Sequence, residues 1–183
     1  MSRTILITLL TLFISALLAL APAPATAIED YPRYQPATKC SPRAKPGTVE
    51  LARWLVQKYG GRRGPIARSC GGSTSEHTEG RAVDWMLDAD HRSDRRRAQR
   101  FLDRVFGTDA RGHTDALARR MGIMYVIWRD RMYAAWDGYR PKPYLSSSCP
   151  SRRKCSKTLR HRDHVHVSLT RRAARGHTSW YRR

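Results

Sequence analysis

The sequence has few acidic residues and a large excess of basic ones. Its 183 residues include 15 aspartates and glutamates against 35 lysines and arginines, which gives a formal net charge of +20. Such a charge favours anionic surroundings, for example nucleic acid, a phospholipid surface or an acidic cell-wall polymer. Arginine is spread along the whole chain, so the charge describes the environment of the protein and does not define a reaction.

Long apolar runs are absent after Leu20, so no later segment is expected to cross a bilayer. The run from Ile5 to Leu20 follows Arg3 and precedes Ala25-Thr26-Ala27. This order of charged, apolar and small residues is typical of a secretory signal peptide. An uncleaved membrane anchor is the alternative, which the small-residue site disfavours. We expect residues 1–27 to be removed, leaving a secreted or cell-wall-associated monomer without a stable membrane span.

The four cysteines form no C-x-x-C pair, which argues against a cysteine-rich structural zinc site. An even number of cysteines in an exported chain indicates two disulfides. Of the three possible pairings we favour Cys149–Cys155, which closes a short loop, together with Cys40–Cys70. The sequence alone leaves the other pairings open.

Internal repeats and strand–helix–strand alternation are also absent, so we expect an α+β domain with a small antiparallel sheet, flanking helices and disulfides. Its parts are a signal peptide (1–27), an extended arm (28–47), the domain itself (48–169) and a basic tail (170–183). Helices are expected after N-caps at Thr48 and Ser93 and over 114–121, ending near Tyr59, Gly107 and Gly122. Strands are expected over 66–69, 81–87 and 163–169, with a hairpin of 124–128 and 132–136 and a loop over 137–160.

Two polar motifs lie on the expected strands. In the first, S-E-H-T-E-G-R-A-V-D at 75–84, His77 lies in a turn and Asp84 on the strand face opposite an apolar one. In the second, D-H-V-H-V-S at 163–168, His164 and His166 project from one strand face while valines project from the other. If the two strands are neighbours, His77, Asp84 and His166 converge on one point.

Two imidazoles and one carboxylate suit Zn²⁺. Three protein ligands with one open position are the pattern of catalytic zinc, whereas structural zinc usually has four. The metal would lower the pKa of a bound water to about 7, and a neighbouring general base would complete a hydrolytic site. We therefore expect one zinc ion on the open face of the sheet.

These motifs in this order resemble the zinc peptidases grouped with D-alanyl-D-alanine carboxypeptidases, lysostaphin-type endopeptidases and the hedgehog signalling domain. The resemblance spans about residues 66–169. The segment between the two motifs is similar to that of exported actinobacterial members without an assigned activity. The resemblance implies a small antiparallel sheet flanked by helices, with His77, Asp84 and His166 as zinc ligands.

The resemblance leaves two candidates for the general base. The endopeptidase branch implies His164 as base, with His161 supporting the transition state. The carboxypeptidase branch implies the position of Asp163, although that branch has a glutamate there. Strand geometry favours His164, which shares a face with His166, unless a bulge reverses the order. Arg68 resembles an arginine of the carboxypeptidase branch that steadies an oxyanion or a substrate carboxylate, and a solvated charge is its alternative interpretation.

The sequence thus predicts an exported zinc-dependent peptidase or amidase whose substrate is the peptide part of peptidoglycan, held near anionic wall polymers by its basic surface. Whether cleavage is internal or carboxy-terminal stays open. The alternative is a non-catalytic module in which zinc is structural and the arginines bind a wall polymer or another polyanion. We do not expect nucleic acid as the partner, because the protein is exported and lacks interleaved aromatic residues that stack on single strands.

Overall fold

The computed structural model describes residues 28–72 and 75–182, so the expected signal peptide over 1–27 lies outside the described residues. The chain forms a six-stranded antiparallel sheet in the order β1-β2-β6-β3-β4-β5, flanked by helices. The expected α+β class is confirmed. The strands are β1 (Arg62–Arg63), β2 (Ala82–Met86), β3 (Ile123–Trp128), β4 (Arg131–Ala134), β5 (Pro141–Pro143) and β6 (Val165–Leu169).

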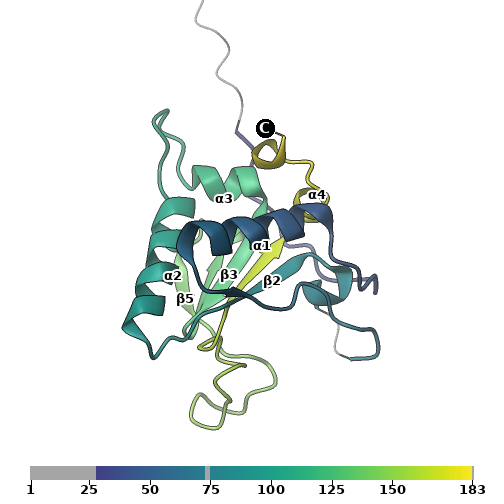
Figure 1. Cartoon of the computed structure of the whole chain (residues 1–183), viewed down its shortest axis with the longest axis vertical. Coiled ribbons are helices and arrows are strands. Elements are labelled where there is room, and N and C mark those ends of the chain that lie inside the picture. The colour runs from purple at the N-terminus through teal and green to yellow at the C-terminus, as the bar shows by residue number, and fades with distance from the viewer. Residues whose placement is uncertain (1–27, 73–74, 183) are drawn as a thin grey trace, which may run out of the picture.

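Over residues 28–72 and 75–182, four α-helices and three short 3-10 turns complete the fold. Figure 1 shows α1 lying across the sheet with α2 beside it, and the β5–β6 loop extending beyond one end of the sheet. Across the described residues, no helix is both long enough and apolar enough to cross a membrane. The helical elements are α1 (Pro46–Tyr59), α2 (Arg92–Val105), α3 (Ala116–Met121), α4 (Arg171–Ala174), η1 (Glu76–Glu79), η2 (Ala135–Asp137) and η3 (Ser179–Tyr181).

Strands β2 and β6 lie side by side although about 80 residues separate them. Val83 is the partner of Val167, and both side chains are fully buried in the main core. The next pair, Asp84 and His166, therefore points to the opposite face. The division between an apolar and a polar face, expected from the sequence for both strands, is confirmed.

Helices α1 and α2 cover the apolar face of the sheet with the residues that their periodicity predicts. Two of the three expected helix starts were too late. Thr48 is not an N-cap but a buried residue of α1, because Pro46 occupies the first turn and Lys45 takes the extended N-cap conformation. Similarly, α2 begins at Arg92 after His91, so Ser93 lies inside it. The apolar side chains that the two helices bury are Leu51, Ala52, Leu55, Tyr59, Ala98, Phe101, Leu102 and Val105.

The strand expected over 66–69 is wrong, and β1 instead comprises two earlier residues. Pro65 has no N–H group for a strand ladder, and the Arg68 N–H donates to the His77 carbonyl at 3.1 Å. The segment therefore follows the η1 turn. The hairpin β3–β4 is confirmed, although β4 ends at Ala134 and residues 135–137 form η2.

Both favoured disulfides, Cys40–Cys70 and Cys149–Cys155, are present, and none of the described cysteines is free. Two disulfides are compatible with an extracellular protein. The first joins the N-terminal arm to the segment before η1, and the second closes a short loop between β5 and β6. After β6, the segment that contains α4 and η3 packs Ala173 and Trp180 into the main core.

The two disulfides close loops of different length, which predicts different losses of stability. Cys40 and Cys70 are 30 residues apart in the sequence. Replacing both with serine is expected to lower the free energy of unfolding by about 3–4 kcal/mol, because the unfolded chain regains the entropy that this long loop had lost. The matched change at Cys149 and Cys155, with a separation of 6, should cost about 2 kcal/mol. Urea unfolding measures both, and an equal or reversed loss would contradict the prediction.

Candidate metal centre

Three side chains from separate elements meet on the polar face of the sheet. Asp84 on β2 and His166 on β6 are direct cross-strand partners. His77 comes from η1, which ends at Gly80 with a φ of 65°, a left-handed conformation that glycine adopts readily. A Cβ at Gly80 would lie 2.0 Å from the Arg43 carbonyl oxygen, so this turn accepts no side chain.

The facing atoms of this histidine–aspartate centre form an almost equilateral triangle. His77 Nε2 lies 3.1 Å from Asp84 Oδ1 and 3.2 Å from His166 Nδ1, and the remaining edge is 3.1 Å. Ligand atoms about 2.0–2.1 Å from a tetrahedral zinc ion lie about 3.3 Å apart. All three side chains are buried. The group could hold a metal ion.

The outer nitrogens of both imidazoles are hydrogen-bonded, which directs the inner nitrogens into the triangle. His77 Nδ1–H donates to the Ile66 carbonyl oxygen at 3.1 Å, which leaves a lone pair on Nε2. His166 Nε2 lies 2.8 Å from Ser168 Oγ. Histidines that bind metals usually donate their other N–H in this way.

A chain of buried hydroxyl groups fixes the tautomer of His166. The Tyr125 hydroxyl donates to Glu76 Oε2 at 2.7 Å, so its oxygen accepts the hydrogen bond from Ser168. Ser168 has then used its proton and accepts from His166 Nε2–H. Burial and the Glu76 carboxylate raise the pKa of Tyr125, which keeps this phenol protonated. The lone pair of His166 therefore lies on Nδ1.

Asp84 is ionised despite its burial. Burial alone would raise its pKa, but hydrogen bonds and charge interactions with His166 and His77 outweigh that effect and hold the pKa below its usual range. The carboxylate therefore carries the negative charge that a cation at the centre of the triangle requires.

His164 lies directly beside the triangle and has its own partner. Its Nδ1–H donates to Asp163 Oδ1 at 2.7 Å, and its Nε2 lies 3.6 Å from Asp84 Oδ1. The other oxygen of Asp163 accepts the Thr158 hydroxyl. Burial would raise the pKa of Asp163, but these two donors lower it. The Asp163 carboxylate thus orients His164, whose free Nε2 faces the triangle.

His161 and Arg68 differ in their relation to the centre. The ring of His161 lies 4.8 Å from that of His164 and 5.6 Å from that of His166, between centroids. Burial, followed by the neighbouring histidines, lowers the pKa of His161 to about 2. Arg68 is exposed; its backbone N–H bonds to His77, and its side chain forms no ion pair within the described residues.

An exposed aromatic pair lies close to the centre on the same side of the sheet. The rings of Tyr34 and Trp136 meet edge to face at 5.3 Å, and these side chains are 54% and 49% exposed. Trp136 also contacts Tyr125, which stacks on His166 with centroids 5.6 Å apart. A ligand above His166 would therefore meet aromatic surface.

Sequence reasoning missed the supporting residues of this centre. Ser168 lies two positions after His166, so the two-residue period of a strand could have assigned it to the same face. Glu76 and Tyr125 carry no such signal, because their contact joins η1 to β3 across 49 positions of the sequence.

Comparison with known proteins gives one family. A family model described as VldE, C-terminal domain, matches residues 40–151. The matched region includes His77 and Asp84 and ends before His161. No curated protein and no solved structure matches the chain.

The hydroxyl chain predicts that Ser168 tunes metal binding without being a ligand. Ser168→Ala removes the acceptor of His166 Nε2–H and should weaken metal affinity about 10–100-fold. Competition with a chromophoric chelator measures this, and exposed Ser148, replaced in the same way, is the matched control. An unchanged affinity of the Ser168 variant would show that the hydroxyl does not orient the imidazole.

Proposed function

The chain belongs to the family described as VldE, C-terminal domain, and from the geometry of its histidine–aspartate centre we propose that it is a zinc-dependent hydrolase of peptide or amide bonds. The family description specifies no reaction, so the chemistry of the residues carries the proposal. The key observation is the triangle of His77, Asp84 and His166 with His164, held by Asp163, at its side.

Zinc is the metal that this donor set favours. Two imidazole nitrogens and one carboxylate oxygen are a borderline-soft set, and three protein ligands leave the open position of a catalytic site. Bound there, Zn²⁺ would act as a Lewis acid on a carbonyl group and lower the pKa of water to about 7.

The side chains around the triangle have distinct roles in this proposal. His164 Nε2 has no proton when Nδ1–H donates to Asp163, so it can accept one from an attacking water. Asp163 is a positioning residue, since it holds the tautomer of His164 and stabilises the imidazolium that forms. His161 has a pKa of about 2 and stays neutral at physiological pH, where it can donate an N–H to a developing oxyanion.

The proposed substrate is the peptide part of peptidoglycan, outside the cell. This choice rests on the resemblance to cell-wall peptidases, on the expected signal peptide and on two disulfides that are compatible with an extracellular protein. The net charge of +20 would hold the enzyme near anionic wall polymers.

Replacing the proposed base should separate turnover from metal binding. His164→Ala is expected to keep stoichiometric zinc and to lower the rate of amine release from peptidoglycan fragments about 10²–10⁴-fold. His91→Ala is the control, because its side chain is 72% exposed. A fully active His164 variant would rule out this base.

The same assay, repeated with a chelator, distinguishes the alternative of a non-catalytic module. A hydrolase loses amine release on chelation and regains it with zinc. Chelation that unfolds a protein without any prior cleavage would favour a structural metal instead. If purified protein binds no metal, both interpretations are wrong.

The exposed aromatic pair, Tyr34 and Trp136, is predicted to contact the substrate and to strengthen its binding without changing the rate of the chemical step. Trp136→Ala should raise KM about 5–20-fold and leave kcat nearly unchanged, because an aromatic face contributes about equally to the ground and transition states. Steady-state kinetics on the fragments measures both constants. Leu159→Ala, which removes another exposed apolar side chain, is the control, and an equal effect of both variants would contradict a specific role for Trp136.

A further inference from the structure

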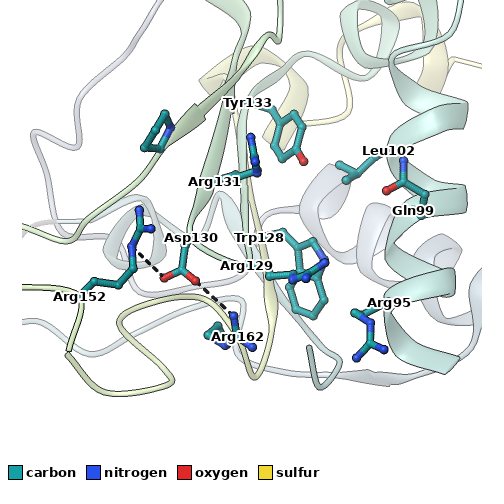
Figure 2. A pocket seen from close by; sticks show the side chains of 11 residues that line it. Arg95, Gln99, Leu102, Trp128, Arg129, Asp130, Arg131, Tyr133, Arg152 and Arg162 are labelled. Carbon is teal, nitrogen blue, oxygen red and sulfur yellow. Dashed lines mark hydrogen bonds and ion pairs between the residues drawn. The ribbon is translucent and has the colours of Figure 1, made fainter. Parts of the chain in front are cut away.

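A second concave site lies on the other face of the sheet and is rich in arginine. Its volume is about 460 Å³. Ile127 is the partner of His166, so the next residue, Trp128, points away from the metal centre and into this arginine pocket. Figure 2 shows the pocket between α2 and the β3–β4 hairpin. It is lined by Arg95, Gln99, Leu102, Trp128, Arg129, Asp130, Arg131, Tyr133, Pro143, Arg152 and Arg162.

Positive charge in this pocket is only partly balanced by the protein, because Arg162 pairs with Asp90 at 2.7 Å as well as with Asp130. Five guanidinium groups and one carboxylate, Asp130, line it. Asp130 is itself bound by Arg160 at 2.7 Å, which lies outside the lining, and by Arg162 at 3.3 Å. Within the described residues, Arg129 and Arg131 form no ion pair, and Arg95 donates to the carbonyl oxygens of two loop residues.

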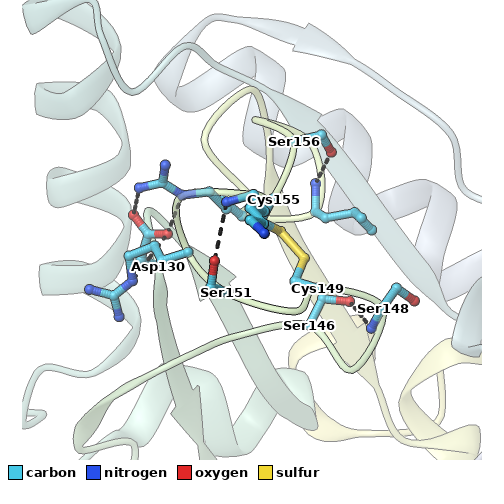
Figure 3. Close-up of a disulfide and its surroundings, with 11 residues drawn as sticks. Asp130, Ser146, Ser148, Cys149, Ser151, Cys155 and Ser156 are labelled. Carbon is cyan, nitrogen blue, oxygen red and sulfur yellow. Dashed lines mark hydrogen bonds and ion pairs between the residues drawn. A yellow bond between two sulfur atoms is a disulfide. The ribbon is translucent and has the colours of Figure 1, made fainter.

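The arginines come from three segments that are fixed relative to one another. Arg95 lies on α2 and Arg129 and Arg131 on the hairpin (Figure 2), whereas Arg152 and Arg162 lie in the loop before β6. Figure 3 shows the Cys149–Cys155 disulfide close to Asp130. This disulfide closes the loop that carries Arg152, whose Nε is 3.9 Å from Asp130.

Backbone contacts hold the hairpin turn that carries the two arginines without an ion pair. Arg129 and Asp130 both have positive φ, 51° and 62°, as a two-residue turn of type I′ requires. The Arg129 N–H donates to the His161 carbonyl at 2.7 Å, and the Asp130 N–H donates to the Arg160 carbonyl at 3.1 Å. The turn is therefore held against the loop.

We propose that this arginine pocket binds phosphate groups, carried either by a small phosphate ester or by the phosphodiester units of a polymer. Guanidinium groups bind phosphate oxygens through two parallel hydrogen bonds. Several arginines around one cavity fit a group that carries more than one charge. The partly exposed ring of Tyr133, at one end of the lining (Figure 2), offers apolar surface for the carbon skeleton of the ligand.

This site is separate from the proposed hydrolytic one, and its test does not depend on turnover. The probes are glycerol 3-phosphate and a glycerol phosphate oligomer, neither of which contains a peptide bond. Sulfate and poly-glutamate serve as anions without phosphate. Calorimetry on the mature chain at two salt concentrations measures each affinity.

Arg129→Gln/Arg131→Gln removes two exposed charges from the pocket and is expected to weaken phosphate binding at least about tenfold. Arg53→Gln/Arg62→Gln changes the net charge equally at exposed positions outside the lining and should leave affinity within about twofold, as expected for screened distant charges. Arg95→Gln, on a different element, should reproduce the loss if the hairpin variant unfolds. Tighter binding of the oligomer per phosphate would indicate a polymer, and binding of the monomer alone a free phosphate ester.

Equal losses in the two double variants would overturn the proposal, because general charge would then explain the binding. Binding of poly-glutamate or sulfate as tight as that of the phosphate probes would also overturn it. Absence of binding by either phosphate probe at low salt has the same consequence. None of these results bears on peptide hydrolysis.

Discussion

The register between β2 and β6 is the constraint on which the rest of the structure depends. Val83 opposite Val167 places apolar side chains under the helices, and the same ladder places Asp84 opposite His166. A slip of one residue would bring Asp84 and His166 into the core and expose the valines. Burial of a valine side chain contributes about 1.5–3 kcal/mol, so the core itself specifies the geometry of the metal centre.

A buried arginine links the η1 turn, which carries the third ligand His77, to the β2–β6 ladder. Arg81, 1% exposed, pairs with Glu79 and donates to the Leu169 carbonyl at 3.0 Å. Burial would raise the pKa of Glu79, but the Thr38 N–H and the guanidinium groups of Arg81 and Arg171 lower it to about 2. Removing one partner of such a buried pair costs about 3–5 kcal/mol. Arg81 thereby fixes the N-terminal arm and the η1 turn that carries His77.

Much of this arrangement could be predicted from short-range patterns. The two-residue period of V-H-V-S-L assigned each side chain to a face, and cysteine spacing favoured the observed disulfides. Patterns failed at element boundaries and where a distant contact decides. Lys45 and Pro46, rather than Thr48, begin α1, and the Ile66 segment bonds to η1 instead of forming a strand. The Ser168–Tyr125–Glu76 chain joins β6 and β3 to η1, a long-range contact that no local period encodes.

The loop before β6 explains how His164, outside any strand, can be held in place. The Arg162 carbonyl accepts the Ala89 N–H at 2.7 Å, and the His161 carbonyl accepts the Arg129 N–H, also at 2.7 Å. Two backbone anchors therefore precede His164, and β6 follows it. The same anchors fix Arg162 beside the arginine pocket on the opposite face. Arg162 lines the arginine pocket, and His164, two positions later, lies beside the metal centre. The loop that fixes one of these sites therefore also fixes the other.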